Sequence, residues 1–98
     1  MIRGTTQTIA LNLPIEIKFD TLYITFAQNS TTILEKTLTD VLIDGKAIVV
    51  PLTQAETLLF SANGYNVRLQ LRGKVGNTAY ASQIMSVPVS DILKGGEI

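Results

Sequence analysis

The sequence predicts an all-β protein, a β-sandwich of about seven short strands with a single helical turn. Three observations lead to this fold class. Segments rich in β-branched and aromatic residues alternate apolar with polar positions, turn-forming residues recur about every 8 to 12 positions, and only the stretch near Thr53 to Phe60 carries a helix signal. No linker-like stretch divides the 98 residues, so we expect one domain over residues 1–98.

Two strands are predicted before residue 28. The segment from Thr8 to Leu13 has an apolar side chain at every second position, and Pro14 ends it because proline lacks the amide that a sheet needs. The segment from Thr21 to Ala27 is rich in β-branched and aromatic residues, so we expect a central strand there. Neither of its faces is charged, so the pattern leaves open which face is exposed.

Two hairpins are predicted next. The polar turn at 28–30 leads into a third strand from Thr31 to Leu38. Asp44-Gly45 separates the apolar segments 41–43 and 47–50. This predicts a hairpin with a type I′ turn, because that turn needs positive φ at both central residues and Asp-Gly tolerates it.

The helical turn is predicted from a capping box. Thr53 and Glu56 have the spacing at which each side chain satisfies the other residue's backbone amide. Asn63-Gly64 then breaks the chain, and the segment from Tyr65 to Arg72 alternates over eight residues. It is expected to be a strand with one buried face, and Tyr65 falls in the core register.

The remaining segments complete the sandwich. Gly73 to Asn77 is expected to form a glycine-bearing hairpin loop, followed by a last strand from about Thr78 to Val87, with Pro88 limiting further pairing. The number and spacing of the strands indicate an immunoglobulin-like sandwich. Residues 1–6 are expected to be a flexible arm and residues 91–98 a loose tail.

The composition argues against catalysis, metal binding and nucleic-acid binding. Eight basic and eight acidic residues give zero net charge, and no basic cluster favours nucleic acid. The chain has no signal-peptide core, no apolar run long enough to span a bilayer, and neither histidine nor cysteine. The acidic pairs Glu16 with Asp20 and Asp40 with Asp44 have ordinary loop spacing. We therefore expect no enzyme, no metal site, no cofactor, and neither nucleic acid nor a membrane as a partner.

Two surfaces are candidates for contact with another protein. The exposed positions of the 65–72 strand form a polar ladder, and the predicted central strand has a second uncharged face that suggests an association surface. The candidate interaction residues are Tyr23, Thr25, Asn66, Arg68, Gln70 and Arg72.

Five segments of the chain resemble small structural proteins, about 100 residues long, of tailed phages and prophages in Firmicutes. They are Met1 to Thr6, Thr25 to Asn29, Leu34 to Lys36, Leu52 to Leu58 and Val67 to Arg72. The later half is also similar to immunoglobulin-like N-terminal domains of phage baseplate proteins, in which a Leu-Thr-x-x-Glu-Thr turn precedes an alternating strand. The family more often has proline where this chain has Gln7, and no functional residue is transferred.

The resemblance implies a non-catalytic virion structural or assembly protein of the tail, baseplate or neck. Such a protein is made in the host cytoplasm and ends in the virion. Its partners would be other virion proteins, with homo-oligomers also open, through exposed strand edges and an apolar face. The alternative is a carbohydrate- or cell-surface-binding sandwich that uses Tyr23, Tyr65 and Tyr80.

Overall fold

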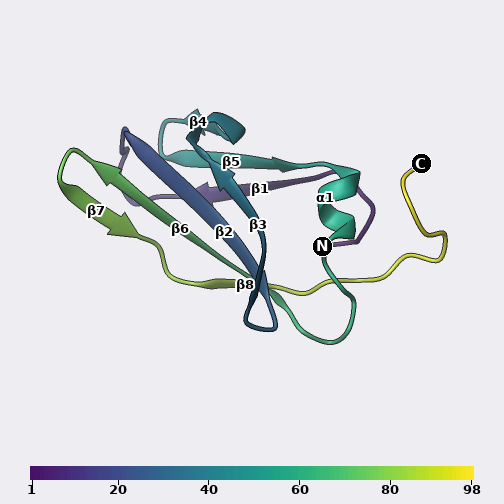
Figure 1. Ribbon diagram of the computed structural model, residues 1–98. Helices are drawn as coiled ribbons and strands as arrows, with labels where there is room; N and C mark the ends of the chain where they lie inside the picture. The colour runs from purple at the N-terminus through teal and green to yellow at the C-terminus, as the bar shows by residue number, and fades with distance from the viewer.

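A computed structural model describes residues 1–98 and contains two antiparallel sheets packed face to face (Figure 1). The three-stranded sheet has the order β1-β5-β4, and the five-stranded sheet has the order β3-β2-β6-β7 with β8 also paired to β6. The elements are β1 (Gln7–Asn12), β2 (Thr21–Gln28), β3 (Thr31–Thr37), a 3₁₀ turn η1 (Leu38–Asp40), β4 (Leu42–Asp44), β5 (Ala47–Leu52), α1 (Gln54–Leu58), β6 (Val67–Val75), β7 (Thr78–Ala81) and β8 (Met85–Val87).

The strand order confirms the predicted all-β, immunoglobulin-like sandwich. Immunoglobulin sandwiches place strands B, E and D in one sheet and C′, C, F and G in the other. Across the first sheet, β1, β5 and β4 correspond to B, E and D. Across the second sheet, β3, β2, β6 and β7 correspond to C′, C, F and G. The structure has eight strands rather than about seven because the predicted last strand is interrupted.

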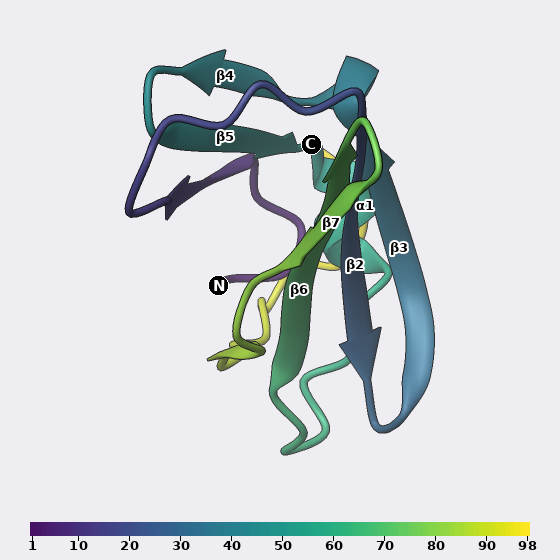
Figure 2. The ribbon, with the colours of Figure 1, turned by 90° about the vertical axis from the view of Figure 1, so that its left-hand side faces the viewer.

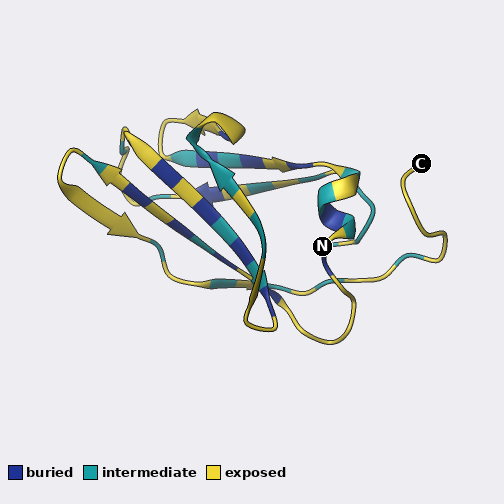
Figure 3. Ribbon diagram, viewed as in Figure 1, coloured by how far each residue is buried: buried dark blue, intermediate teal, exposed yellow.

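The core lies between the two sheets. Buried and exposed residues alternate along β2 and β6, the pattern of strands with one covered face (Figure 3). Each fully buried Leu, Ile, Val or Phe stabilises the fold by about 1.5 to 3 kcal/mol relative to an exposed one. The most buried apolar side chains are Leu22, Ile24, Phe26, Ile48, Val50, Leu52, Phe60, Val67, Leu69 and Leu71.

The hairpin turns differ in type from the prediction. Asp44 pairs with Ala47, so Gly45 and Lys46 are the central residues of the β4–β5 turn. Only Gly45 has positive φ, which is the pattern of a type II′ turn and makes the predicted type I′ turn wrong. Positive φ at both central residues occurs instead in the β2–β3 turn, at Asn29 and Ser30.

Strand β6 continues through the glycine that was expected to open a loop. Gly73 is buried in β6, and the ring of Phe19 lies where a side chain at this position would project. Phe19 also makes an edge-to-face contact with Tyr80 on β7, with ring centroids 6.1 Å apart. Aromatic packing over the bare backbone compensates for the missing side chain, so the turn narrows to Gly76 and Asn77.

The predicted strand from Thr78 to Val87 is split at residues 82–84. The hydroxyl oxygen of Ser82 accepts a hydrogen bond from the Leu71 amide at 3.0 Å, and the Ser82 amide donates to the Leu71 carbonyl at 2.9 Å. The serine side chain therefore replaces a backbone carbonyl in the ladder. Pairing with β6 shifts by one residue beyond this point, which separates β7 from β8.

The short helix α1 forms where the capping box predicted it. The Glu56 amide donates to the Thr53 hydroxyl at 3.2 Å, and the Thr53 amide donates to the Glu56 carboxylate at 2.9 Å. Glu56 also forms an ion pair with Lys36 of β3, which fastens the helix to the five-stranded sheet. At the other end of α1, the Arg3 guanidinium donates to the carbonyls of Leu58 and Phe60.

The two ends of the chain meet beside the helix (Figure 1). Ile2 pairs with Ser90 in a parallel bridge, and Arg3 forms an ion pair with Asp91 at 3.0 Å. In the tail, the Gln54 side chain exchanges hydrogen bonds with the backbone of Ile98. The expected flexibility of the arm and of the tail stays a prediction. No helix of the structure has the length and hydropathy needed to cross a membrane.

Candidate protein-interaction face

The outward side of the five-stranded sheet brings most of the predicted interaction residues together. Strands β2 and β6 are neighbours, and their register places Tyr23 opposite Arg72 and Thr25 opposite Gln70. Leu22 and Ile24, which alternate with Tyr23 and Thr25, are buried in the core. The structure thus answers the question left open by the sequence, because Tyr23 and Thr25 are on the solvent side of β2.

Arg68 and Asn66 differ in their relation to this sheet. Arg68 is exposed and lies opposite Ala27, on the same side as Arg72. Asn66 is also an even-numbered residue, like Arg68 and Arg72. However, β6 begins at Val67, so Asn66 lies beyond the end of the sheet. The structure places the other five predicted residues on one face and Asn66 outside it.

Two further charged residues belong to this face. Lys74 is exposed and pairs with Thr21, and Glu35 of β3 pairs with Thr25. The sequence prediction assigned Lys74 to a loop, although its even position continues the ladder of residues 68, 70 and 72. We define the outer face as the following residues: Tyr23, Thr25, Glu35, Arg68, Gln70, Arg72 and Lys74.

The outer face is basic and its cations have no ion-pair partners. Arg68, Arg72 and Lys74 contribute three positive charges, and Glu35 contributes one negative charge. The two ion pairs of the structure, Arg3 with Asp91 and Lys36 with Glu56, involve none of them. The Thr25 hydroxyl donates to the Glu35 carboxylate at 3.3 Å. A chain with zero net charge thus has a local excess of positive charge on one face.

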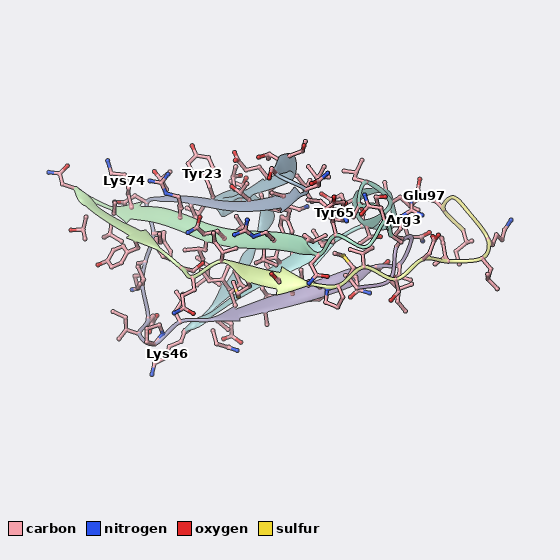
Figure 4. All side chains as sticks on the ribbon, turned by 90° about the horizontal axis from the view of Figure 1, so that it is seen from below. Arg3, Tyr23, Lys46, Tyr65, Lys74 and Glu97 are labelled. Carbon is pink, nitrogen blue, oxygen red and sulfur yellow. The ribbon has the colours of Figure 1, made fainter.

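Tyr23 provides the large apolar element of the outer face. Its side chain is 44% exposed, and a shallow depression beside it is lined by residues of β2, β3, β6 and β7. Figure 4 shows Tyr23 and Lys74 projecting from one side of the molecule and Lys46 from the opposite side. The outward residues of β7, Ala79 and Ala81, are small and leave this side of the sheet flat.

The three tyrosines lie in different places. Tyr65 is 51% exposed and precedes β6, so the prediction that it packs in the core is wrong. The strand begins two residues later than the alternation suggested because the Tyr65 amide donates to the Asn63 side chain and its carbonyl accepts from Gln28. Tyr80 packs edge-to-face on Phe19, in the inward register of β7.

The carboxyl groups with shifted pKa values have local structural partners. Hydrogen bonds from the Thr37 amide and hydroxyl lower the pKa of Asp40, and the Ile92 amide and Arg3 lower that of Asp91. Partial burial raises the pKa of Glu56, but the hydrogen bonds and charge of Lys36 and the Thr53 amide outweigh it and lower the pKa overall. All three carboxylates cap or fasten backbone segments away from the outer face.

Each acidic pair noted in the sequence has one carboxylate that binds a nearby backbone amide. The Asp20 carboxylate accepts from the Gly76 amide at 2.6 Å and holds the β6–β7 turn. Asp40 caps the 3₁₀ turn, and Asp44 is the last residue of β4. No group of three or more acidic side chains is gathered in the geometry of a cation site.

Comparison with known proteins gives one similar solved structure. No family model matches the chain, and no curated protein sequence matches it. The V domain of amphioxus IgVJ-C2 is similar with a TM-score of 0.43 and 10% sequence identity, covering 94% of this chain and 97% of that chain.

Proposed function

We propose that this chain is a non-catalytic assembly protein of a tailed-phage virion, in the tail, baseplate or neck. It binds a neighbouring virion protein through the outer face of the five-stranded sheet. The observation that carries the proposal is the gathering of Tyr23, Arg68, Arg72 and Lys74 on one rigid sheet face, with no ion-pair partners for the three cations.

The residue types of the outer face suit a protein partner. Tyrosine and arginine are enriched among the residues that dominate binding energy at protein interfaces, because each offers a large contact area and directional hydrogen bonds. Three cations against one carboxylate favour a partner surface that is acidic. Because the side chains project from paired strands, little backbone entropy is lost on binding.

The assignment to a phage particle draws on the sequence resemblance. The similar segments Met1 to Thr6, Leu52 to Leu58 and Val67 to Arg72 are dispersed through the fold and belong to the arm, the helical turn and β6. Small proteins of tailed phages act in repeated copies within symmetric particles, and such particles need rigid modules with defined contact faces.

The titratable groups are consistent with a structural role. The three carboxylates with lowered pKa values cap a 3₁₀ turn, cap a helix and bind the arm. A serine or threonine nucleophile needs a base within hydrogen-bond reach, and the chain has no histidine to provide one. The glycan-binding alternative needs aromatic rings that share a surface. Here Tyr23 lies on the outer face, Tyr65 precedes β6, and Tyr80 packs inward on Phe19.

The proposal is tested on particles of the phage or prophage that encodes the chain. The expected result is that peptides of the chain are present in purified virions by quantitative mass spectrometry. A plasmid-encoded copy with Arg72→Glu is expected to be incorporated at least tenfold less than the unmodified copy. Lys46→Glu makes the same charge reversal on the opposite side, and this control is expected to be incorporated normally.

Two results contradict the proposal. One is that the chain is abundant in the producing cells but absent from the particles. The other is equal incorporation of the Arg72→Glu and Lys46→Glu copies, with equal melting temperatures for the two purified variants. Binding of the purified chain to a glycan array through Tyr23 would support the carbohydrate-binding alternative instead.

A further inference from the structure

Strand β1 is a long sheet edge without the features that keep edges unpaired. Edge strands are normally protected by charges, by short length or by bulges. Strand β3 carries Glu35 and Lys36, and β4 has only three residues and includes Asp44. The six residues of β1 include no charge, and nothing pairs with its second edge (Figure 2).

The backbone groups on this free edge are identified by the pairing with β5. The Leu13 amide donates to the Lys46 carbonyl at 2.8 Å, in the same register as the β1–β5 ladder. Because hydrogen-bonded pairs alternate along antiparallel strands, the odd-numbered residues of β1 bond to β5. The amides and carbonyls of Thr8, Ala10 and Asn12 therefore point to the free edge.

An apolar groove lies below this edge, between β1 and the strands β7 and β8. Its lining includes no charged residue, and most of its members are apolar. The inward side chains of β1, Ile9 and Leu11, lie over the same side. An added strand that continued the three-stranded sheet would therefore have to present apolar side chains inward and uncharged ones outward. The larger apolar residues of the groove are Leu11, Leu13, Ile17, Phe19, Tyr80 and Met85.

We propose that the occupant is β1 of a second copy of this chain, paired antiparallel about a two-fold axis at Ala10. This deepens the proposed function, on which it rests, by naming one of the contacts made during assembly. The register places Ala10 opposite its counterpart and Thr8 opposite Asn12 of the second copy. The two three-stranded sheets then form one continuous sheet through three hydrogen-bonded pairs.

Charge and shape favour a second copy over another partner. The sequence of β1 is its own complement, because it meets the requirement of apolar residues inward and small uncharged residues outward. In the two-fold register no charge faces a like charge, and Ile9 of one copy lies beside Leu11 of the other. Such a self-complementary contact closes a dimer and leaves the outer face, on the other sheet, free for the neighbouring virion protein.

The test is sedimentation equilibrium of the purified full chain over a concentration series. Ala10→Lys keeps the side chain on the solvent side and places two lysines opposite each other across the axis, so the dimer dissociation constant is expected to rise at least tenfold. Ala10→Glu is expected to do the same. An equimolar mixture of the two variants is expected to recover the dimer, because the opposed charges then attract.

A proline variant tests the backbone pairing separately from charge. Ala10→Pro removes an amide that points to the free edge and leaves the hydrogen bonds to β5 in place, so the monomer is expected to fold and the dimer to be lost. Ala79 is the matched control, because it is an exposed alanine on the uncharged edge strand β7. Ala79→Lys and Ala79→Pro are expected to leave the dimer unchanged.

Three outcomes overturn the inference. They are a strict monomer at every concentration, a dimer that Ala10→Lys and Ala10→Pro leave intact, and a dimer that only the Ala79 variants disrupt. The proposed function fails separately, by absence of the chain from virions. A chain that is monomeric in solution and yet enters particles in a manner that depends on Arg72 would overturn the β1 pairing alone.

Discussion

Gly73 shows how one residue fixes the packing of several. A β-carbon at this position would lie 2.5 Å from a ring carbon of Phe19 and 2.8 Å from the Thr21 carbonyl oxygen. Phe19 is buried and also contacts Tyr80, so its ring has little room to move. The absence of a side chain at Gly73 therefore allows the loop before β2 to close over the end of the sandwich.

Gly73→Ala is expected to destabilise the protein by about 1 to 3 kcal/mol, the usual result of forcing extra volume into a packed site. Chemical unfolding monitored by circular dichroism measures this change. Gly95→Ala is the matched control, because a β-carbon there has no neighbour within 4 Å, and its expected effect is below about 0.5 kcal/mol. Equal stability of the two variants would show that Phe19 does not need the space at Gly73.

Gln28 is the buried polar side chain that holds the 61–65 segment. Its amide nitrogen donates to the Ser61 and Tyr65 carbonyls, and its amide oxygen accepts from the Ser61 amide at 2.8 Å. Gln28→Leu leaves these backbone groups without partners, at an expected cost of about 2 to 4 kcal/mol in unfolding free energy. Gln83→Leu, at an exposed side chain without hydrogen bonds, is expected to be close to neutral, and a similar loss in both variants would contradict this role.

At the scale of elements, α1 couples stability to pH through Glu56. The pKa of Glu56 is lowered in the folded protein, so its contribution is present above the unfolded pKa of about 4.3 and is lost as pH falls through the folded pKa. Glu56→Gln keeps the capping geometry but loses the charge that pairs with Lys36.

The expected cost of Glu56→Gln is about 1 kcal/mol at pH 7, because the ion pair is partly shielded from solvent. The stabilities of the variant and the unmodified protein are expected to converge as the pH falls below about 4.3 and through the lowered pKa of Glu56 in the folded protein. Unfolding free energies of both proteins, measured from pH 7 into the acid range, test this prediction. A difference that stays constant while Glu56 becomes protonated in the folded protein would mean that its charge contributes nothing to stability.

Strand positions were predicted correctly where they depend on neighbouring residues. The predictions were wrong where a contact with a distant segment determines where a strand ends. The capping box at Thr53 and the alternation from Thr21 to Ala27 depend on neighbouring residues, and both elements form as expected. The extension of β6 past Gly73 needs the ring of Phe19, and the break at Ser82 needs its hydrogen bond to Leu71. No sequence pattern contains these contacts between distant segments.

The residues of the candidate face were also predicted only in part. Residue parity correctly grouped Arg68, Gln70 and Arg72. The sequence proposed Tyr23 and Thr25 as interaction residues but left open which face of β2 is exposed, and the structure places both on the outward side. The contributions of Glu35 and Lys74 were missed because they depend on which strands are neighbours and how far β6 extends. Sheet order and register are tertiary properties, and one strand's pattern does not determine them.

At the scale of the whole molecule, the two sheets offer separate contact surfaces. The five-stranded sheet presents the basic outer face, and the three-stranded sheet presents the uncharged edge of β1. Under the two proposals, the chain binds a second copy through one sheet and a different protein through the other. This arrangement suits a module that is repeated within a symmetric particle.

Binding of a neighbouring virion protein to the outer face can be tested by cross-linking mass spectrometry of intact virions with an amine-reactive reagent. We expect Lys74, on the outer face, to be linked to a different virion protein and Lys46, on the opposite side, not to be linked to one. Particles in which Lys46 is linked to other virion proteins and Lys74 is modified by the reagent without any link would contradict this expectation.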